Sequence, residues 1–221
     1  MIEENNDKET LIQAEGLSKS FKKLNVLKGL DLAWKEGERI ALIGQNGAGK
    51  TTLIRCILGE YVYEGHLKVL GLNPRKQRVE ILKQVGFVPQ IPPPLKMTVK
   101  DLLRFFSEIS GVKQNRFIDI ADALGLQVKE SLSKPFVALS GGMKQKLLVS
   151  FALGRNPKIL LMDEPSANLD PAARAMFFDL LTGYDKDSLL ILSSHRMTEI
   201  KGIVTRVVEM DFGSIVLDKK V

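Results

Sequence analysis

Gly44-Gln45-Asn46-Gly47-Ala48-Gly49-Lys50-Thr51 is the stretch that decides the fold class of this chain of 221 residues. It matches the pattern G-x-x-x-x-G-K-[ST] at every fixed position. Its glycines let the backbone curl, so that successive N–H groups point inward at the oxygens of a phosphate. The apolar run 39–43 before it predicts a buried strand, and a helix from Lys50 to about Leu58 is predicted after it. The sequence therefore predicts a phosphate-binding loop between a strand and a helix.

Two side chains of this loop are suited to nucleotide chemistry. Lys50 is expected to bridge the β- and γ-phosphates of a nucleoside triphosphate, and the Thr51 hydroxyl to bind Mg²⁺. The alternative is a chance glycine-rich turn. The predicted strand and helix on either side favour the functional interpretation.

A second apolar run, Ile159-Leu160-Leu161-Met162, ends in the carboxylates Asp163 and Glu164. A buried strand delivers such a pair to the carboxyl edge of the sheet, where the phosphate-binding loop also opens. Asp163 is suited to hold Mg²⁺, directly or through water, and Glu164 to polarise an attacking water. An acidic pair after a strand can also be a solvated loop or a helix cap. The phosphate-binding loop favours the catalytic interpretation.

The turn Leu139-Ser140-Gly141-Gly142 predicts a second anion site. Ser140 can cap the following helix, and the two glycines leave the first N–H groups of that helix uncovered. A plain helix cap is the alternative.

Strand-like and helical segments alternate along the chain, which favours a mainly parallel α/β sheet. Further strands are expected at 12–17, 66–70, 85–88, 189–192, 206–210 and 214–217, and further helices at 76–84, 141–153 and 170–182. Between Gln90 and Leu139 the character changes. Pro92, Pro93 and Pro94 exclude a helix or central strand, Thr98 is expected to cap a helix that runs to Ser110, and a second helix is expected at 115–124. We expect a helical subdomain inserted there.

Composition limits the function classes without choosing one. The net charge is +6, but the basic cluster Arg75, Lys76, Arg78 and Lys83 contains no stacking aromatic residues, so no nucleic acid is expected as a partner. Cys56 is the only cysteine, which suits a reducing compartment. The polar stretch 1–10 lacks the features of a signal peptide, and no apolar run reaches the length of a membrane helix. We therefore expect a cytoplasmic protein.

Taken together and in this order, these motifs resemble the ATP-binding cassette (ABC) family over nearly the whole chain. The turn at Ser140 resembles the family's LSGGQ signature, with Met143 in place of the usual Gln. The remaining matches are Gln90 to the Q-loop glutamine, Ser166-Ala167-Asn168-Leu169-Asp170 to the D-loop, His195 to the H-loop histidine, and Phe21 to the aromatic residue that stacks on adenine. Alone, Gln90 could be an ordinary polar residue, His195 a surface histidine and Phe21 part of the core.

The resemblance implies a P-loop NTPase fold: a mainly parallel central sheet, an N-terminal antiparallel β part and an inserted helical subdomain. Residues 1–10 would be a polar tail and 11–221 a single ABC ATPase domain, with its helical subdomain at about 91–155.

The resemblance also implies site residues. Glu164, His195 and Lys50 would be catalytic. ATP would be bound by Phe21, Gly44, Gln45, Asn46, Gly47, Ala48, Gly49, Lys50, Thr51 and Thr52. A second subunit would bind the same ATP through Ser140, Gly141 and Gly142. Mg²⁺ would be held by Thr51, Gln90 and Asp163, while Asp170 and Gln90 would serve dimer contact and coupling.

The implied partners are a second ATPase subunit, identical or paired, and an integral membrane permease that holds the chain at the inner face of the membrane. The apolar segment 91–97 with Phe105 and Phe106 would suit a docked permease helix, although the phenylalanines could instead pack internally. Met143 and the short stretch after His195 favour an exporter-type subunit. The alternative is a non-transport ABC ATPase that acts with a soluble assembly or scaffold partner.

Overall fold

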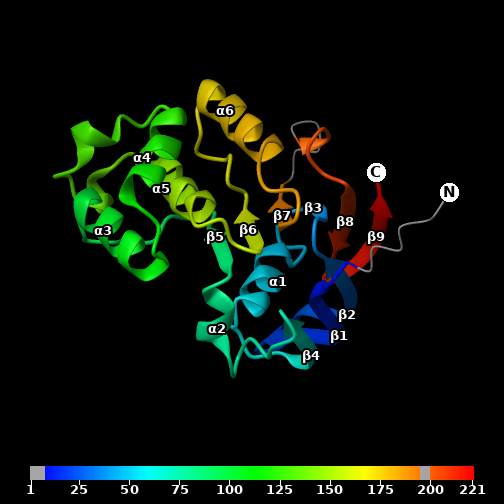
Figure 1. Ribbon diagram of the computed structural model, residues 1–221. Coiled ribbons are helices and arrows are strands. Elements are labelled where there is room, and N and C mark those ends of the chain that lie inside the picture. Colours follow the sequence, from blue (N-terminus) through cyan, green and yellow to red (C-terminus); the bar gives the residue numbers. More distant parts are fainter. Residues whose placement is uncertain (1–7, 195–199) are drawn as a thin grey trace.

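The computed structural model describes residues 8–194 and 200–221, whose strands form two sheets (Figure 1). The larger sheet has six strands in the order β5-β6-β7-β3-β8-β9. They are β5 (Val85–Val88), β6 (Ile159–Asp163), β7 (Leu189–Ser193), β3 (Arg39–Ile43), β8 (Arg206–Asp211) and β9 (Ser214–Lys220). All are parallel except β9, which pairs antiparallel with β8. The predicted α/β fold with a mainly parallel central sheet is confirmed.

Alternate residues of the parallel strands belong to two different cores. On one face, Ile40 and Leu42 of β3 pack with α1 (Lys50–Ile57). On the other face, Ala41 packs with α5 (Gly141–Gly154) and α6 (Pro171–Thr182). Because both faces are covered, the strands read as continuous apolar runs. That is why their positions could be predicted closely.

The smaller sheet is antiparallel, in the order β2-β1-β4, and lies on the far side of α1 from the large sheet (Figure 1). Its strands are β1 (Thr10–Phe21), β2 (Leu24–Lys35) and β4 (Glu64–Val69). Strand β2 is not among the strands expected from the sequence. The buried residues of β2 alternate from Leu30 to Trp34, but Gly29 interrupts the period with a φ of +64°. Such a bulge hides a strand from a search for strict alternation.

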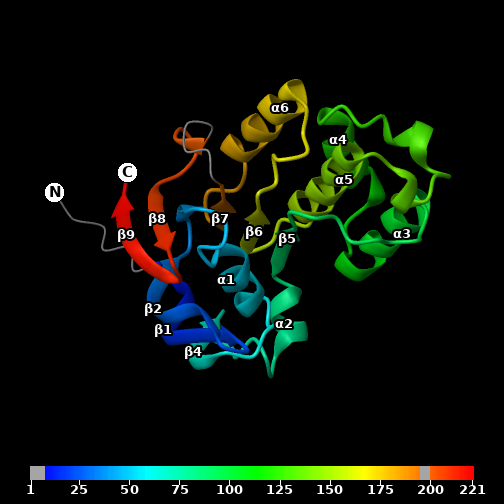
Figure 2. The same cartoon turned by 180° about the vertical axis from the view of Figure 1, so that it is seen from behind.

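The helices that lie between β5 and β6 in the sequence are grouped together beside the large sheet in both views (Figures 1 and 2). They are α3 (Val99–Ser110), α4 (Gln114–Ala123), the short 3₁₀ turns η1 (Val128–Ser131) and η2 (Phe136–Ala138), and α5. As predicted, Thr98 caps α3, accepting a hydrogen bond of 3.1 Å from the Asp101 N–H. Phe106 stacks on Phe151 with ring centroids 4.1 Å apart, so it packs internally, whereas Phe105 is 45% exposed.

Helix α5 is shared by two cores. Val149, Ala152 and Leu153 pack with the sheet and α6, whereas Leu147 and Phe151 pack with α3 and α4. Every residue from Leu147 to Gly154 is buried, as expected for a helix that is apolar on all sides. The helix therefore joins the helical region to the sheet.

Arg39 and Arg155 secure the C-terminal ends of two helices. The Arg39 guanidinium donates to the carbonyls of Leu181 in the last turn of α6 and of Tyr184 just after the helix. Arg155 donates to the carbonyls of Leu82 and Lys83, at the end of α2 (Arg78–Leu82). Helix α2 is shorter than the predicted 76–84. Across residues 8–194 and 200–221, no helix is long and apolar enough to cross a membrane.

Candidate functional site

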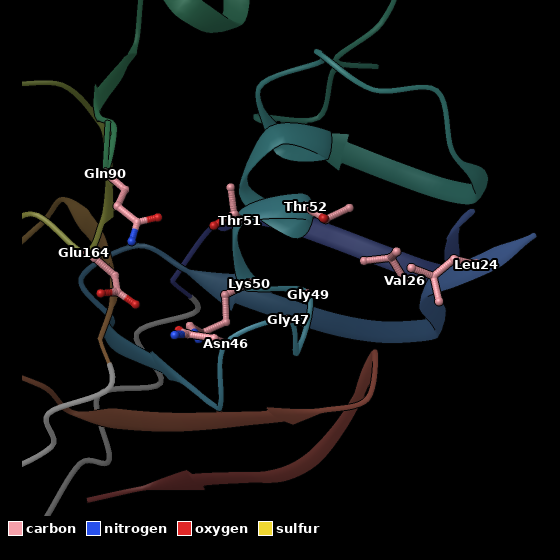
Figure 3. A pocket seen from close by; sticks show the side chains of 10 residues that line it. All are labelled: Leu24, Val26, Asn46, Gly47, Gly49, Lys50, Thr51, Thr52, Gln90 and Glu164. Carbon is pink, nitrogen blue, oxygen red and sulfur yellow. The ribbon is translucent and has the colours of Figure 1, made fainter. Parts of the chain in front are cut away.

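A cleft of about 400 Å³ opens where the carboxyl ends of β3, β5 and β6 meet (Figure 3). It is lined by Leu24, Val26, Asn46, Gly47, Gly49, Lys50, Thr51, Thr52, Gln90 and Glu164. In Figure 3, Gln90 and Glu164 lie across the cleft from Lys50 and Thr51. The structure thus brings together residues from three of the predicted motifs.

The phosphate-binding loop depends on glycine at two close approaches. Gly44 has a φ of +146°, and a Cβ there would lie 2.2 Å from the Met210 carbonyl oxygen. Gly49 has a φ of +108°, and a Cβ there would meet the Leu27 side chain at 2.9 Å. Strands β8 and β2 therefore press on the loop from outside, and a larger residue would push it into the cleft.

Lys50 begins α1 and folds back over its own loop. Its ammonium donates to the carbonyl oxygens of Gly44 at 2.6 Å and Gln45 at 3.0 Å. The residue is only 6% exposed. Burial lowers the pKa of this amine, while the Glu164 and Asp163 carboxylates act in the opposite direction. The ammonium is held at the loop, where it can exchange carbonyl oxygens for phosphate oxygens.

Asp163, at the end of β6, is the centre of a buried hydrogen-bond network. Its Oδ2 accepts from the Thr51 hydroxyl at 2.8 Å, and its Oδ1 accepts from the Ser193 hydroxyl at 2.6 Å. The Ser193 oxygen in turn accepts from the Glu164 backbone N–H at 2.9 Å. Asp163 therefore links the loop, β6 and β7. It orients the Thr51 hydroxyl that was predicted to bind Mg²⁺.

Glu164 is the first residue beyond β6 and has a φ of +45°. This left-handed conformation is uncommon for residues other than glycine and clusters at functional sites. The Ser193 hydroxyl supports it by accepting from the Glu164 N–H. The strained turn places the Glu164 side chain at the cleft.

The oxygen donors of the cleft fit a Mg²⁺ ion. The Thr51 hydroxyl and the Gln90 amide line the cleft, and the buried Asp163 carboxylate accepts from Thr51. All three are hard oxygen ligands of the kind that Mg²⁺ prefers. Within the described residues, no group of three or more His, Cys, Asp or Glu side chains could hold a metal.

The Ser140 turn lies at the N-terminus of α5, outside this cleft. Ser140 caps the helix by accepting from the Met143 N–H at 3.2 Å. A Cβ on Gly141 would meet nothing within 4 Å, so the backbone is open to an approaching ligand. None of the described residues that line the cleft comes from this turn. In a single chain, the two predicted anion sites are therefore separate.

Asp170 makes two contacts, of which the sequence predicts the helix cap. As expected, it caps α6 by accepting from the Ala173 N–H at 2.9 Å. It also pairs with Lys146 of α5 at 3.2 Å. The Ala173 hydrogen bond and the Lys146 contact lower the pKa of this carboxyl. The role of Asp170 in dimer contact stays a prediction.

Phe21 does not line the cleft. Its ring packs edge-on against Tyr61, with centroids 5.1 Å apart, and the Lys19 ammonium lies 4.6 Å from its centre. It is 40% exposed, and stacking on adenine stays a prediction. Leu24 and Val26 line the cleft instead, from the start of β2. Sequence reasoning missed both because it missed that strand.

His195 lies outside the described residues, as do residues 1–7 of the predicted polar tail. Ser193, two positions before His195, was missed as a site residue. The available signal was a polar residue at the end of the buried strand β7, next to the strand that carries the acidic pair.

Comparisons with known proteins show the family to which the chain belongs. Residues 27–167 match the family described as ABC transporter. The phosphate import ATP-binding protein PstB 1 of Enterococcus faecalis is 31% identical over 87% of this chain and 83% of its own length. The linearmycin resistance ATP-binding protein LnrL of Bacillus subtilis is 29% identical over 93% of this chain and 68% of its own. A solved structure of the ATP binding subunit of an ABC transporter superposes with a TM-score of 0.84 at 25% identity, covering 96% of this chain and 90% of that one.

Proposed function

The chain belongs to the ABC transporter family and is an ATP-binding, ATP-hydrolysing subunit, and from this premise we propose how its residues divide the work. ATP lies in the cleft with its phosphates along the Gly44–Thr51 loop. Lys50 holds the β- and γ-phosphates, and Glu164 orients and deprotonates the water that attacks the γ-phosphate. The observation that supports this most is the position of Glu164, fixed at the cleft opposite Lys50 by its left-handed turn.

We propose Thr51 and Gln90 as ligands of Mg²⁺, with Asp163 holding the Thr51 hydroxyl in place. When bound, Mg²⁺ neutralises charge on the β- and γ-phosphates. Asp163 uses both of its oxygens in hydrogen bonds to Thr51 and Ser193. Each of these oxygens keeps a second lone pair, so Asp163 could also reach the ion directly or through a water. The orienting role follows from the geometry without either.

We propose that two ATPase subunits close around ATP. The open backbone at Gly141 and the first N–H groups of α5 would meet the phosphates bound in the other subunit's cleft. The separation of the Ser140 turn from the cleft within one chain supports this arrangement. Hydrolysis removes the γ-phosphate that both subunits bind, so the pair opens again.

The closing motion would drive a separate membrane permease, at the inner face of the membrane. The surface proposed for docking contains Ile91, Met97, Phe105 and Ile109, which are 79%, 39%, 45% and 55% exposed. They lie just after Gln90 and on α3. An apolar permease helix would cover them. Phe106 is not part of this surface, because it stacks on Phe151 inside the helical region.

For direction, we propose an exporter-type subunit, supported by Met143 in place of the usual signature glutamine. The resistance protein LnrL fits this direction, and the import protein PstB 1 fits the opposite one. A transport assay with the assembled transporter in vesicles tests this direction. ATP-dependent movement of substrate away from the ATPase side supports export, and movement toward that side refutes it.

Co-purification tests the function as a whole. The tagged chain should hydrolyse ATP and should come out of solubilised membranes together with an integral membrane protein. Changing Ile91 and Phe105 to serine should remove that partner without reducing ATP binding. Recovery of a soluble partner alone would instead support an assembly or scaffold ATPase.

A further inference from the structure

Gln145 is a polar residue enclosed in the first turns of α5. It is 0% exposed. Its Nε2 donates to the carbonyl oxygen of Pro89 at 3.4 Å, which is long for a hydrogen bond. Its Oε1 has no hydrogen-bond partner among the residues described. A buried amide satisfied so poorly costs stability, and a better packed apolar residue would not.

Among the described residues, the Gln145 side chain donates to the Pro89 carbonyl, which lies next to the cleft. Pro89 follows β5 directly, and the next residue, Gln90, lines the cleft. Pro89 has no N–H of its own, so its carbonyl is the only backbone hydrogen-bonding group that it can offer. The Gln145 amide therefore donates to the peptide group that leads into Gln90.

Helix α5 is well placed to transmit a movement to this point. A Cβ on Gly86 of β5 would lie 3.1 Å from the Ala152 carbonyl oxygen, so helix and strand are in close contact. Lys146, the residue after Gln145, pairs with Asp170 at the start of α6. Successive helical residues point about 100° apart. One turn of α5 thus contacts the segments that follow both β5 and β6.

We propose that Gln145 is a positioning residue for Gln90: its amide holds the Pro89 carbonyl and thereby ties the place of Gln90 in the cleft to the tilt of α5. This inference rests on the proposed function, in which Gln90 binds Mg²⁺. The Ser140 turn begins α5. A phosphate bound at that turn would therefore change the tilt of α5 and, through Gln145, the position of Gln90. The long bond and the unpaired Oε1 leave the amide free to change partners when the helix tilts.

The first test replaces Gln145 with methionine, which has a similar length and no donor. The matched control is Ser150→Ala, because Ser150 is also 0% exposed on α5 but donates to Leu147 within the helix. Hydrogen exchange of the chain without nucleotide should be faster over residues 88–97 in Gln145→Met and unchanged there in Ser150→Ala. The thermal midpoint of Gln145→Met should not fall, because the unpaired Oε1 is removed. If this variant does not fold, Gln145→Leu takes its place.

The second test is a double-mutant cycle with Gln90→Ala. In the wild-type background, Gln145→Met should raise the Mg²⁺ concentration for half-maximal ATP hydrolysis by about 10-fold. In the Gln90→Ala background, the same change should have no further effect. Equal effects in both backgrounds, or unchanged exchange over 88–97, would overturn the proposal. A wild-type chain that does not hydrolyse ATP would refute the proposed function instead, and the exchange test would still judge Gln145.

Discussion

Ser193 donates a hydrogen bond of 2.6 Å to Asp163 from the neighbouring strand, while its own oxygen accepts from the backbone N–H of Glu164. One hydroxyl thus orients the carboxylate that holds Thr51 and supports the strained residue that faces the cleft. The end of β7 is thereby part of the site, although Ser193 is not among the residues that line the cleft.

Ser193→Ala should therefore reduce ATP hydrolysis more than ATP binding. The change removes the Ser193 hydrogen bonds to the Glu164 N–H and to one Asp163 oxygen, and kcat should fall by about 10-fold. The free energy of unfolding should fall by about 1–3 kcal/mol, the usual cost of unpaired buried groups. Steady-state kinetics and denaturant titration measure both effects.

Ser188→Ala is the matched control, since Ser188 lies just before β7, is 4% exposed and donates to the Pro157 carbonyl. It should lower stability by a similar amount and leave kcat unchanged. An equal loss of kcat in both variants would contradict the role of Ser193.

Lys50→Ala should bring ATP binding below detection by calorimetry. The variant loses the ammonium that lies 2.6 Å from the Gly44 carbonyl, at the centre of the loop. Lys83→Ala, at an exposed position after α2, should bind ATP like the wild type. Unchanged affinity in Lys50→Ala would show that the phosphates lie elsewhere.

Glu164→Gln should bind ATP and hydrolyse it at least about 100-fold more slowly, because the amide cannot accept a proton from water. With the γ-phosphate retained, paired subunits should accumulate. Light scattering after size exclusion should show a dimer in ATP and a monomer without it. Hydrolysis at the wild-type rate would refute the assignment of Glu164.

Asp170→Asn separates the charge of this residue from its capping. Asn is also a good N-cap, but it cannot form the ion pair with Lys146. The folded pKa of Asp170 is lowered, so its charge stabilises the fold above the unfolded-state pKa near 4, and this contribution is lost as the pH falls through the lower folded value. The wild type should be the more stable protein at pH 7, and the difference should shrink below about pH 4. Denaturant titrations at several pH values measure it, and a constant difference would contradict the ion pair.

The sequence predicted what depends on local pattern. Buried parallel strands such as β3 are continuous apolar runs. The capping residues Thr98 and Asp170 indicate where α3 and α6 begin. Strand β2 escaped because the bulge at Gly29 breaks its alternation. A local pattern can be recognised in the sequence without knowledge of the tertiary contacts.

The sequence predicted those site residues that belong to recognisable motifs. Lys50, Thr51, Gln90 and Glu164 do line one cleft. Ser193 and Gln145 were missed because their importance comes from contacts with residues far along the chain, at Asp163 and Pro89. Only the packing of strands and helices reveals such pairs.

The sharing of α5 between two cores also has a consequence for how the molecule melts. Heat that loosens α3 and α4 exposes Leu147 and Phe151, on the same helix that fills the core under the sheet with Val149 and Leu153. Neither region can lose its order while the other keeps it, so calorimetry should record one cooperative peak rather than two.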